Sequence, residues 1–149
     1  MDRGCISNVA LQKQITDLIT AMGADCEIHL MKGSLVPGPD STLAELMGAA
    51  PVGTWYTPKA ATPGALMITN DGKYGFALAC QNWAYTGTDP GETITAWFVA
   101  SKATVTATIG PNVYIAGGVF KEQMPMNDPL NQARADIVLL WPPVTDQSL

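Results

Sequence analysis

The stretch CEIHLMKGSLVPGPDSTLAEL, residues 26–46, decides how the rest of the chain is interpreted. Its first residues, 26–31, alternate between two faces, and this alternation is typical of a β-strand. Gly33 ends the pattern, and the two prolines that follow hold the chain extended. The stretch therefore predicts one strand and then a long loop, which we expect to run from Gly33 to Thr57.

Upstream of this strand, residues 8–22 predict an amphipathic α-helix. We expect Ser7 or Asn8 to cap its start and Gly23 to end it in the left-handed conformation. The stripe packs either on the protein's own sheet or, as an arm, on a neighbouring subunit. Apolar residues at helical spacing form the stripe: Leu11, Ile15, Leu18, Ile19 and Met22.

Downstream, most of the chain predicts short strands. Asn70-Asp71-Gly72 is a strong hairpin signal, and Gly117-Gly118 predicts a bulge. A proline-containing crossover is expected over 123–131, and the last strand is apolar on both parities, so we expect it to be covered on both sides. The predicted strands are 65–68, 74–80, 93–100, 103–109, 113–120 and 135–141.

This pattern of strands predicts the fold class of the protein, and the sequence contains no internal repeat. Many short strands with one leading helix favour an all-β fold, an antiparallel β-sandwich of the jelly-roll-like kind with one N-terminal amphipathic helix. We expect one domain over 1–149. It would consist of an N-terminal arm and helix (1–23), the sandwich (26–141) and a short polar tail (142–149).

The amino-acid composition indicates which kinds of partner the protein can bind. Charged residues are only 14% of the chain, against a usual share of about 25%, and 47% are apolar. A charge-poor surface suits a protein in lasting contact with another protein. The net charge is −5, and the 8 basic residues are scattered. Because affinity for nucleic acid comes largely from neutralising phosphates, we expect no binding to nucleic acid, and none to an anionic membrane.

The cysteines and the N-terminus bear on the compartment. Cys5, Cys26 and Cys80 form no CxxC pair, and Met1-Asp2-Arg3-Gly4 is not followed by an apolar signal core. No apolar run approaches the ~20 residues of a spanning helix. These features predict synthesis in a reducing cytoplasm with three free thiols, with a disulfide between two of them as the alternative.

His29 is the only histidine and the first candidate for chemistry. Glu27 lies on the same strand face, and the two could supply ligands of a metal site shared between subunits. A half-exposed strand histidine is the simpler interpretation. Cys26 lies on the opposite face of the strand, and no serine stands on a sharp glycine-flanked turn, so we predict neither a cysteine nor a serine nucleophile.

Acidic and aromatic residues at turns are the second candidates. Two carboxylates could form the acid–base pair of a glycosidase, and the turns at 70–72 and 89–92 could hold calcium. Solvated carboxylates are expected in such turns anyway, so we expect no enzyme, no metal and no cofactor. The aromatics could form a sugar-stacking platform, with core packing as the default. The carboxylates are Asp40, Glu45, Asp71, Asp89, Glu92 and Asp128, and the aromatics are Trp55, Tyr56, Trp83 and Tyr85.

The order of these segments resembles a group of small virion proteins of tailed phages, encoded near major-capsid genes. The resemblance covers about residues 8–141 and rests on ALQKQITDLITAMG, CEIHLMKGS, PDSTLAEL, ITAWFVAS, VYIAGGVF and ADIVLLW, in that order. In that group a strand ends in a basic residue plus a turn residue, here Lys32-Gly33, and an acidic-Thr-Leu-Ala-acidic loop follows, here residues 40–45. The chain departs from the group at 53–56, where it has Gly-Thr-Trp-Tyr.

The resemblance implies a capsid decoration, or cement, protein with a jelly-roll-like fold. Such a protein binds the outside of the icosahedral head as a dimer or trimer, bridges subunits of the major capsid protein and resides on the virion exterior. We expect the contacts to come from the arm (1–11), the long loop (33–57) and the crossover (121–131). The expected partner-binding residues are Val36, Leu43, Leu46, Met47, Trp55, Tyr56, Met124 and Met126.

Three other functions remain open at this point. A tail, baseplate or head–tail connector protein would use a similar sandwich with ring symmetry. A carbohydrate-binding module for host attachment would expose Trp83 or Trp55. An enzyme would lose turnover when one carboxylate is changed.

Overall fold

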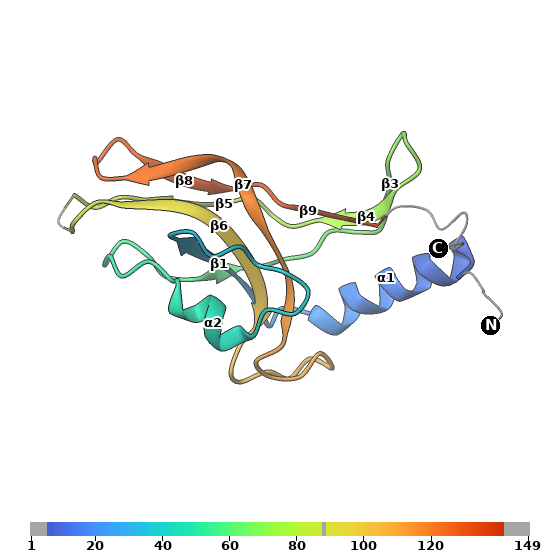
Figure 1. Ribbon diagram of the computed structural model, residues 1–149. Coiled ribbons are helices and arrows are strands. Elements are labelled where there is room, and N and C mark those ends of the chain that lie inside the picture. The colour runs from blue at the N-terminus through green and yellow to red at the C-terminus, as the bar shows by residue number, and fades with distance from the viewer. Residues whose placement is uncertain (1–5, 88, 142–149) are drawn as a thin grey trace.

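The computed structural model describes residues 6–87 and 89–141, and strands make up most of it (Figure 1). Every strand pair among these residues is antiparallel, which confirms the predicted all-β character with one long N-terminal helix. The elements are α1 (Asn8–Met22), β1 (Cys26–Lys32), α2 (Leu43–Gly48), β2 (Lys59–Ala60), β3 (Met67–Ile68), β4 (Tyr74–Ala77), β5 (Gln81–Ala84), β6 (Glu92–Ser101), β7 (Tyr114–Met126), β8 (Gln132–Ala135) and β9 (Val138–Trp141).

The largest sheet has four strands in the order β2-β1-β6-β7. β1 pairs with β6 residue by residue from Cys26↔Ser101 to Met31↔Ala96, and the register shifts only at Lys32. β6 lies between β1 and β7, and its last four residues are all buried. The alternating strand predicted from residues 26–31 is therefore confirmed, and it lies next to the most buried strand of the sheet.

A long two-stranded ribbon forms the second layer. β4 pairs with β9 and β5 pairs with β8, so residues 74–84 run antiparallel to 132–141. Between Ala77↔Val138 and Gln81↔Ala135, one strand has one residue more than the other, and the ribbon bends there (Figure 1). β3 extends the β4 side through the hairpin predicted at Asn70-Asp71-Gly72.

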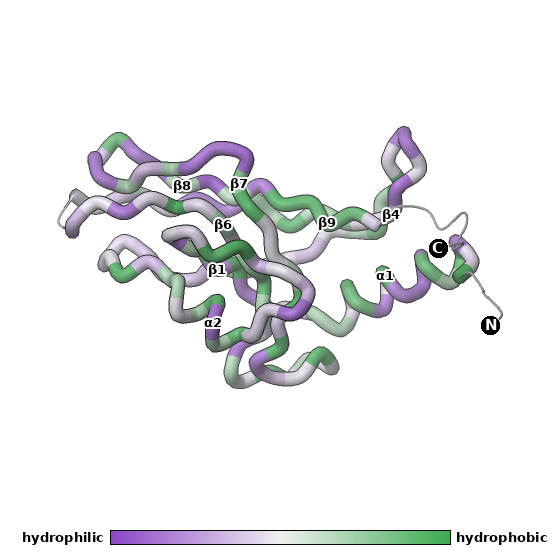
Figure 2. Tube along the Cα trace, viewed as in Figure 1, coloured by the Kyte–Doolittle hydropathy of each residue, from purple (hydrophilic) through white to green (hydrophobic). Residues whose placement is uncertain are grey.

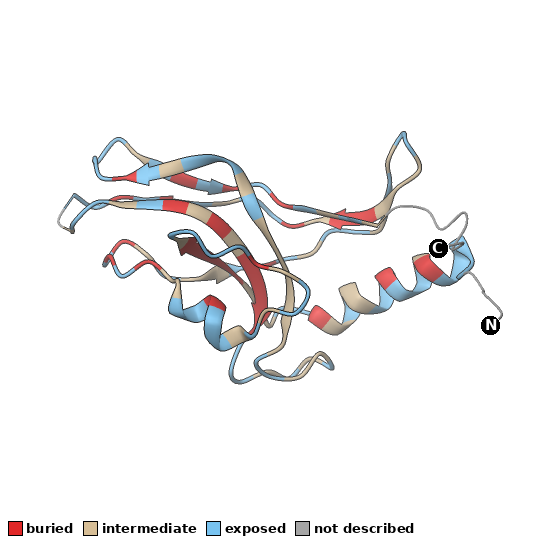
Figure 3. Cartoon of the chain, in the orientation of Figure 1, coloured by how far each residue is buried: buried red, intermediate tan, exposed pale blue. Residues whose placement is uncertain are grey.

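The main hydrophobic core lies between the sheet, the ribbon and α1. Ile28 and Val99 come from the sheet, Phe76 and Trp83 from the ribbon, and Ile15 from α1, and each is at most 2% exposed. Figure 3 shows the buried residues of α1 recurring along the helix. The apolar stripe of α1 therefore packs on the protein's own core, one of the two alternatives that the sequence leaves open.

The ends of α1 form nearly as predicted. Ser7 Oγ accepts a hydrogen bond from Ala10 N at 3.1 Å and caps the start. Gly23 ends the helix with φ of 52° and ψ of −133°, which has the positive φ expected but is not the left-handed helical conformation.

The strand predicted over 103–109 is wrong. These residues form a loop that Asp25 holds: its Oδ2 accepts hydrogen bonds from Thr106 N at 3.0 Å and Ala107 N at 2.9 Å. Those two backbone hydrogen bonds lower the pKa of Asp25. The alternation of threonine with apolar residues matched a strand, but no strand of the described residues pairs with this segment.

The bulge predicted at Gly117-Gly118 is also wrong. Both glycines pair in register, Gly118 with Trp97 and Gly117 with Phe98, and the irregularities of β7 fall on either side of them. A Cβ on Gly118 would lie 2.9 Å from the Trp97 ring, and one on Gly117 would lie 2.5 Å from Pro37. These glycines therefore allow close side-chain approach rather than a change of register.

Three further predictions from local pattern fail. Residues 123–126 are not part of a crossover, because they continue β7 and lead through a short turn into β8. Residues 135–141 form the end of β8 and the whole of β9, and β9 is an edge strand with Val138 and Leu140 more than 40% exposed. The predicted long loop contains a helix, α2.

A buried carboxylate ties the long loop to the sheet. Glu92 is only 6% exposed, and its oxygens accept hydrogen bonds from Val52 N at 3.0 Å and Gly53 N at 2.8 Å. Lys32 Nζ lies 2.9 Å from the same carboxylate. Burial would raise the pKa of Glu92, but the hydrogen bonds from Val52, Lys32 and Gly53 together lower it.

We expect Glu92→Gln to destabilise the protein by about 2 kcal/mol, because the amide keeps the size but loses the charge that accepts these hydrogen bonds. Urea unfolding at neutral pH measures the change. The control is Asp17→Asn, which breaks an exposed ion pair with Lys13 and should change stability by less than about 0.5 kcal/mol. Equal effects of the two substitutions would contradict a structural role for Glu92.

Candidate functional site

The helix α2 covers part of the outer face of the four-stranded sheet. Thr42 Oγ1 caps this helix by accepting a hydrogen bond from Glu45 N at 3.3 Å. Leu46 then points into a second core with Met31 and Phe98, and all three side chains are 0% exposed. Because α2 is only six residues long, it covers one part of the face and leaves the rest to loops.

A cleft of about 250 Å³ lies beside α2, at the end of the face where β1 begins and β6 ends. Leu43 and Met47 from α2 and Pro58 form its apolar wall. The remaining lining is mostly polar, and is contributed by Glu27, His29, Ser101, Lys102 and Asn112, with Ala100 and Ala103.

His29 is one of two buried polar residues that line the cleft, at 6% exposed, and the other is Ser101, at 4%. The His29 ring stacks on Phe98 with the centroids 4.5 Å apart and the planes 8° from parallel. Burial lowers the pKa of His29 to about 4, so the imidazole is neutral at pH 7. A neutral imidazole offers one donor and one acceptor, which suits a backbone or hydroxyl group better than an anion.

The cleft brings together two residues that the sequence singles out and a patch of apolar side chains. Glu27 and His29 do line one cleft, as their spacing predicts. Over residues 6–87 and 89–141, however, no three His, Cys, Asp or Glu side chains gather as metal ligands. An apolar wall of Leu43, Met47 and Pro58 opposite a polar floor is the usual lining of a site that holds part of another molecule.

The predicted partner-binding residues divide into three groups. Leu43 and Met47 meet at the cleft, with Met47 48% exposed. Val36, 59% exposed, lies apart from them in a groove of about 170 Å³ between residues 33–36 and β7. Their role in binding stays a prediction.

The others offer little or no free surface. Leu46 and Met126 are 0% exposed and Trp55 is 7% exposed, because all three belong to the protein's own core. Tyr56 is half-buried and its hydroxyl accepts a hydrogen bond from Leu30 N at 3.1 Å, and Met124 is half-buried in β7. Leu46, Met126 and Trp55 therefore do not present their side chains to a partner in this conformation. Residues 1–5 of the predicted arm lie outside the described residues.

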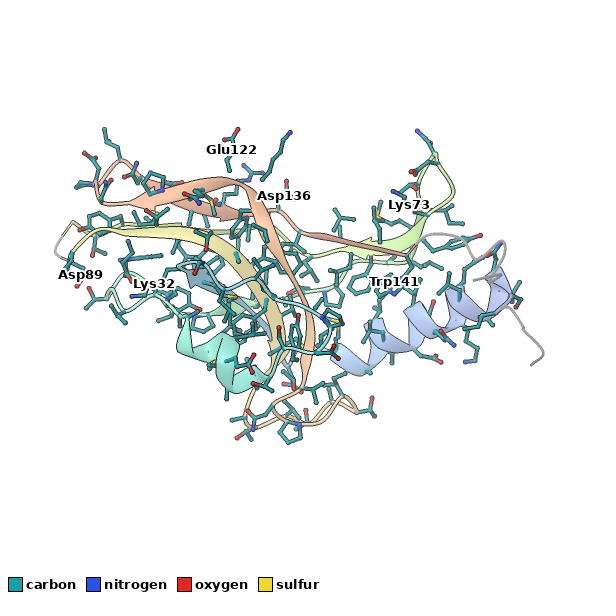
Figure 4. The ribbon with its side chains drawn as sticks, in the orientation of Figure 1. Lys32, Lys73, Asp89, Glu122, Asp136 and Trp141 are labelled. Carbon is teal, nitrogen blue, oxygen red and sulfur yellow. The ribbon has the colours of Figure 1, made fainter. Side chains whose placement is uncertain are left out.

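Four of the six candidate carboxylates, Asp71, Asp89, Glu92 and Asp128, make contacts within turns and loops. Asp89 and Glu92 do come to one turn, at the end of the molecule where Lys32 also lies (Figure 4). Asp89 accepts hydrogen bonds from Thr54 N at 2.8 Å and Thr54 Oγ1 at 2.7 Å. Asp128 accepts one from Leu130 N at 2.8 Å, and Asp71 pairs with Lys73 across the hairpin turn at 3.4 Å.

The aromatics named as a possible sugar-stacking platform are largely buried. Trp83 is 1% exposed and donates a hydrogen bond to Thr57 O at 2.6 Å, and Tyr85 is 7% exposed. Core packing, the default interpretation of these aromatics, is what the structure shows.

The sequence analysis did not identify two residues of the cleft, Lys102 and Asn112. They lie in loops on either side of the mispredicted strand, and the backbone bond from Asn112 N to Lys102 O, 3.1 Å long, joins them. No local pattern signals this pairing. The start of α2 did carry a signal, because Thr42-Leu43-Ala44-Glu45 is a capping box.

The two cysteines of the described residues differ in burial. Cys26 is buried, and burial raises the pKa of its thiol to about 11, so it is a poor nucleophile, whereas Cys80 is exposed and also free. Cys5 lies outside the described residues. Neither helix in the described part of the chain has the length and apolarity to cross a membrane.

The buried His29 predicts a specific pH dependence. In the unfolded chain it binds a proton near pH 6.5, but in the folded protein only near 4. The stability that comes from keeping His29 neutral is therefore fully present above about pH 6.5 and is lost as the pH falls toward 4. Between pH 7 and 5 the free energy of unfolding should fall by about 2 kcal/mol from this group alone.

Urea unfolding at pH 7, 6 and 5 measures this fall, and His29→Gln is the matched variant because its side chain does not titrate. The variant should show a nearly flat profile over this range, since the carboxylates with a lowered pKa, Asp25, Asp71 and Glu92, act mainly at lower pH. Equal slopes for the two proteins would mean that His29 is solvated.

The comparisons with known proteins add no family to this description. The chain matches no protein-family model, no curated protein and no solved structure.

Proposed function

We propose that the protein is a structural phage virion protein, a capsid decoration or cement protein that binds the outer surface of the head and bridges major capsid subunits. With it we propose that the two layers of strands are a jelly-roll-like β-sandwich. The resemblance in segment order supports this function, as does the kind of surface the chain carries.

The observation that carries the proposal is the face built by residues 33–58. This segment lies over the outer face of the sheet, yet much of its own apolar surface stays uncovered: Leu35 is 39% exposed, Val36 59%, Met47 48% and Val52 80%. Figure 2 shows apolar and polar residues alternating along α2. An apolar surface on a charge-poor protein favours a protein partner.

The proposed mechanism is mass action on the assembled state. A protein that binds only the mature shell stabilises it by about 2.7 kcal/mol per site at a free concentration of 100 Kd. Because this stabilisation is repeated over many symmetric sites, interfaces of modest affinity are enough to stabilise the whole shell. The cleft beside α2 would take an apolar side chain of the capsid protein, with His29 and Asn112 paired to its backbone.

A second position in the virion, in the tail, baseplate or head–tail connector, would use the same surface. Ring symmetry and a low copy number distinguish it from decoration. The buried state of Trp83 and Trp55 weighs against the glycan-binding alternative, which needs one of them exposed.

Co-sedimentation of the purified protein with undecorated heads of the phage that encodes it tests the proposal. Saturation at hundreds of copies per head, with a raised melting temperature of the shell, is the expected result, because decoration repeats over the icosahedral lattice. No binding to heads would overturn decoration, and binding at a handful of copies would favour the connector position.

A charge in the cleft should separate specific binding from adsorption. We expect Met47→Asp to weaken binding to heads by about tenfold or more, because the wall would then bury a carboxylate without a partner. The matched control is Ile68→Asp, since Ile68 is 60% exposed, lies in β3 and belongs neither to the cleft nor to the expected contact segments. If both variants bind like the unaltered protein, the cleft is not the contact.

A further inference from the structure

We propose that the free edge of β9 is a self-association surface, which pairs with β9 of a second copy of this chain across a twofold axis. This inference does not rest on the proposed function, because it concerns the opposite part of the molecule and a different partner. It starts from the position of β9 at the end of the β3-β4-β9 sheet.

The pairing of β9 with β4 determines which backbone N–H and C=O groups of β9 point away from β4. Leu78 N donates to Ile137 O at 2.9 Å, so Leu78 and Ile137 are a hydrogen-bonded pair. Antiparallel pairs alternate, so Phe76–Leu139 is hydrogen-bonded and Ala77–Val138 is not. In agreement, Ala77 O points away from β9 and accepts from Gly64 N at 2.8 Å. The N–H and C=O groups of Val138 and Leu140 therefore point outward.

These outward groups are self-complementary. If a second β9 approaches antiparallel with Leu139 facing its own copy, Val138 lies opposite Leu140 of the partner at both ends. Each such pair exchanges two hydrogen bonds, so this register satisfies the outward donors and acceptors of both strands. It also places the twofold axis between the two copies of Leu139.

The side chains favour the same arrangement. Val138 and Leu140 are 45% and 41% exposed and share one face of the sheet, where Met67, 37% exposed, lies beyond Gly75. Pairing two edges would bring two such apolar strips together. Neither β9 nor its neighbour β4 contains a charged residue, and Figure 2 shows β9 as a continuous apolar stretch.

The other face of β9 borders a groove of about 350 Å³. Leu18 of α1, Trp97 of β6 and Ile115 of β7 line it together with β9. Trp141, at the end of β9, lies on the α1 side and stacks on Phe76 (Figure 4). Leu139 faces this side of the sheet, so the partner's copy of that residue would enter the groove and cover apolar surface there.

A second copy is the occupant because this edge lacks the usual protection against it. Natural edge strands carry lysine, proline or a bulge that blocks pairing between copies. Val138–Trp141 contains none of these, the two prolines of the sequence come only after it, at 142–143, and no described strand pairs with the outer side of β9. The opposite edge, β3, is only two residues long and continues into a turn with Asp71 and Lys73.

Sedimentation equilibrium of the full chain over a range of concentrations tests the proposal, with Leu140→Lys as the variant. We expect the unaltered protein to dimerise, and Leu140→Lys to weaken the dimer by about tenfold or more, because a lysine on the edge must be desolvated on pairing. Ile68→Lys is the matched control at the other edge of the same sheet, where Ile68 is 60% exposed. It should leave the dimer unchanged.

Cysteine cross-linking tests the register. Facing residues in a pair without hydrogen bonds lie about 4.5 Å apart at Cα, which is within the range of about 4.4–6.8 Å that a disulfide spans. In a background with Cys5→Ser and Cys80→Ser, which removes the exposed thiol of the described residues and the thiol that lies outside them, Leu139→Cys should form a disulfide-linked dimer on oxidation. Val138→Cys should not, because it faces Leu140 of the partner.

Three results would overturn the proposal. One is an unaltered protein that stays monomeric at every concentration. Another is a dimer that Leu140→Lys does not weaken. The third is a monomer that dimerises only after residues 142–149 are removed, which would assign the edge to the protein's own tail.

Discussion

The pairing of β1 with β6 is the constraint on which the rest of the structure depends. One face of this pair, with Ile28 opposite Val99, belongs to the main core, and the other, with His29 opposite Phe98, belongs to the core under α2. Because side chains alternate strictly, a slip of one residue would exchange the two faces. Both layers of packing, and the position of His29, therefore follow from one register.

The two proposed surfaces arise where this packing stops. On the outer face, α2 is too short to cover the sheet, so the cleft remains between Leu43, Met47 and His29. On the other side, the ribbon ends at β9 without another described strand beyond it. The first surface has polar groups inside an apolar rim, which suits a different protein. The second is apolar and symmetric, which suits a copy of the same chain.

The carboxylates show why the composition of turns is a poor guide to chemistry. Glu92 and Asp89 were candidates for a catalytic pair, and Asp25, just before β1, was not. Each accepts backbone N–H groups of a distant loop, at separations of 35 to 82 residues along the chain. A loop without a strand partner needs acceptors for its N–H groups, and these side chains supply them. Nothing in the local sequence identifies which loop each one holds.

The sequence by itself determined the elements whose pattern is local: α1 with its Ser7 cap, the alternating β1, the central β6 and the hairpin at 70–72. Periodicity, capping and turn chemistry act over a few residues, so they are visible in one segment. Only the tertiary structure decided that 103–109 is a loop, that 135–141 is divided and reaches an edge, and that Leu46 and Met126 are buried while Met47 is not. Those outcomes depend on which distant segment lies alongside, and a strand pattern without a partner to complete its hydrogen bonds does not become a strand.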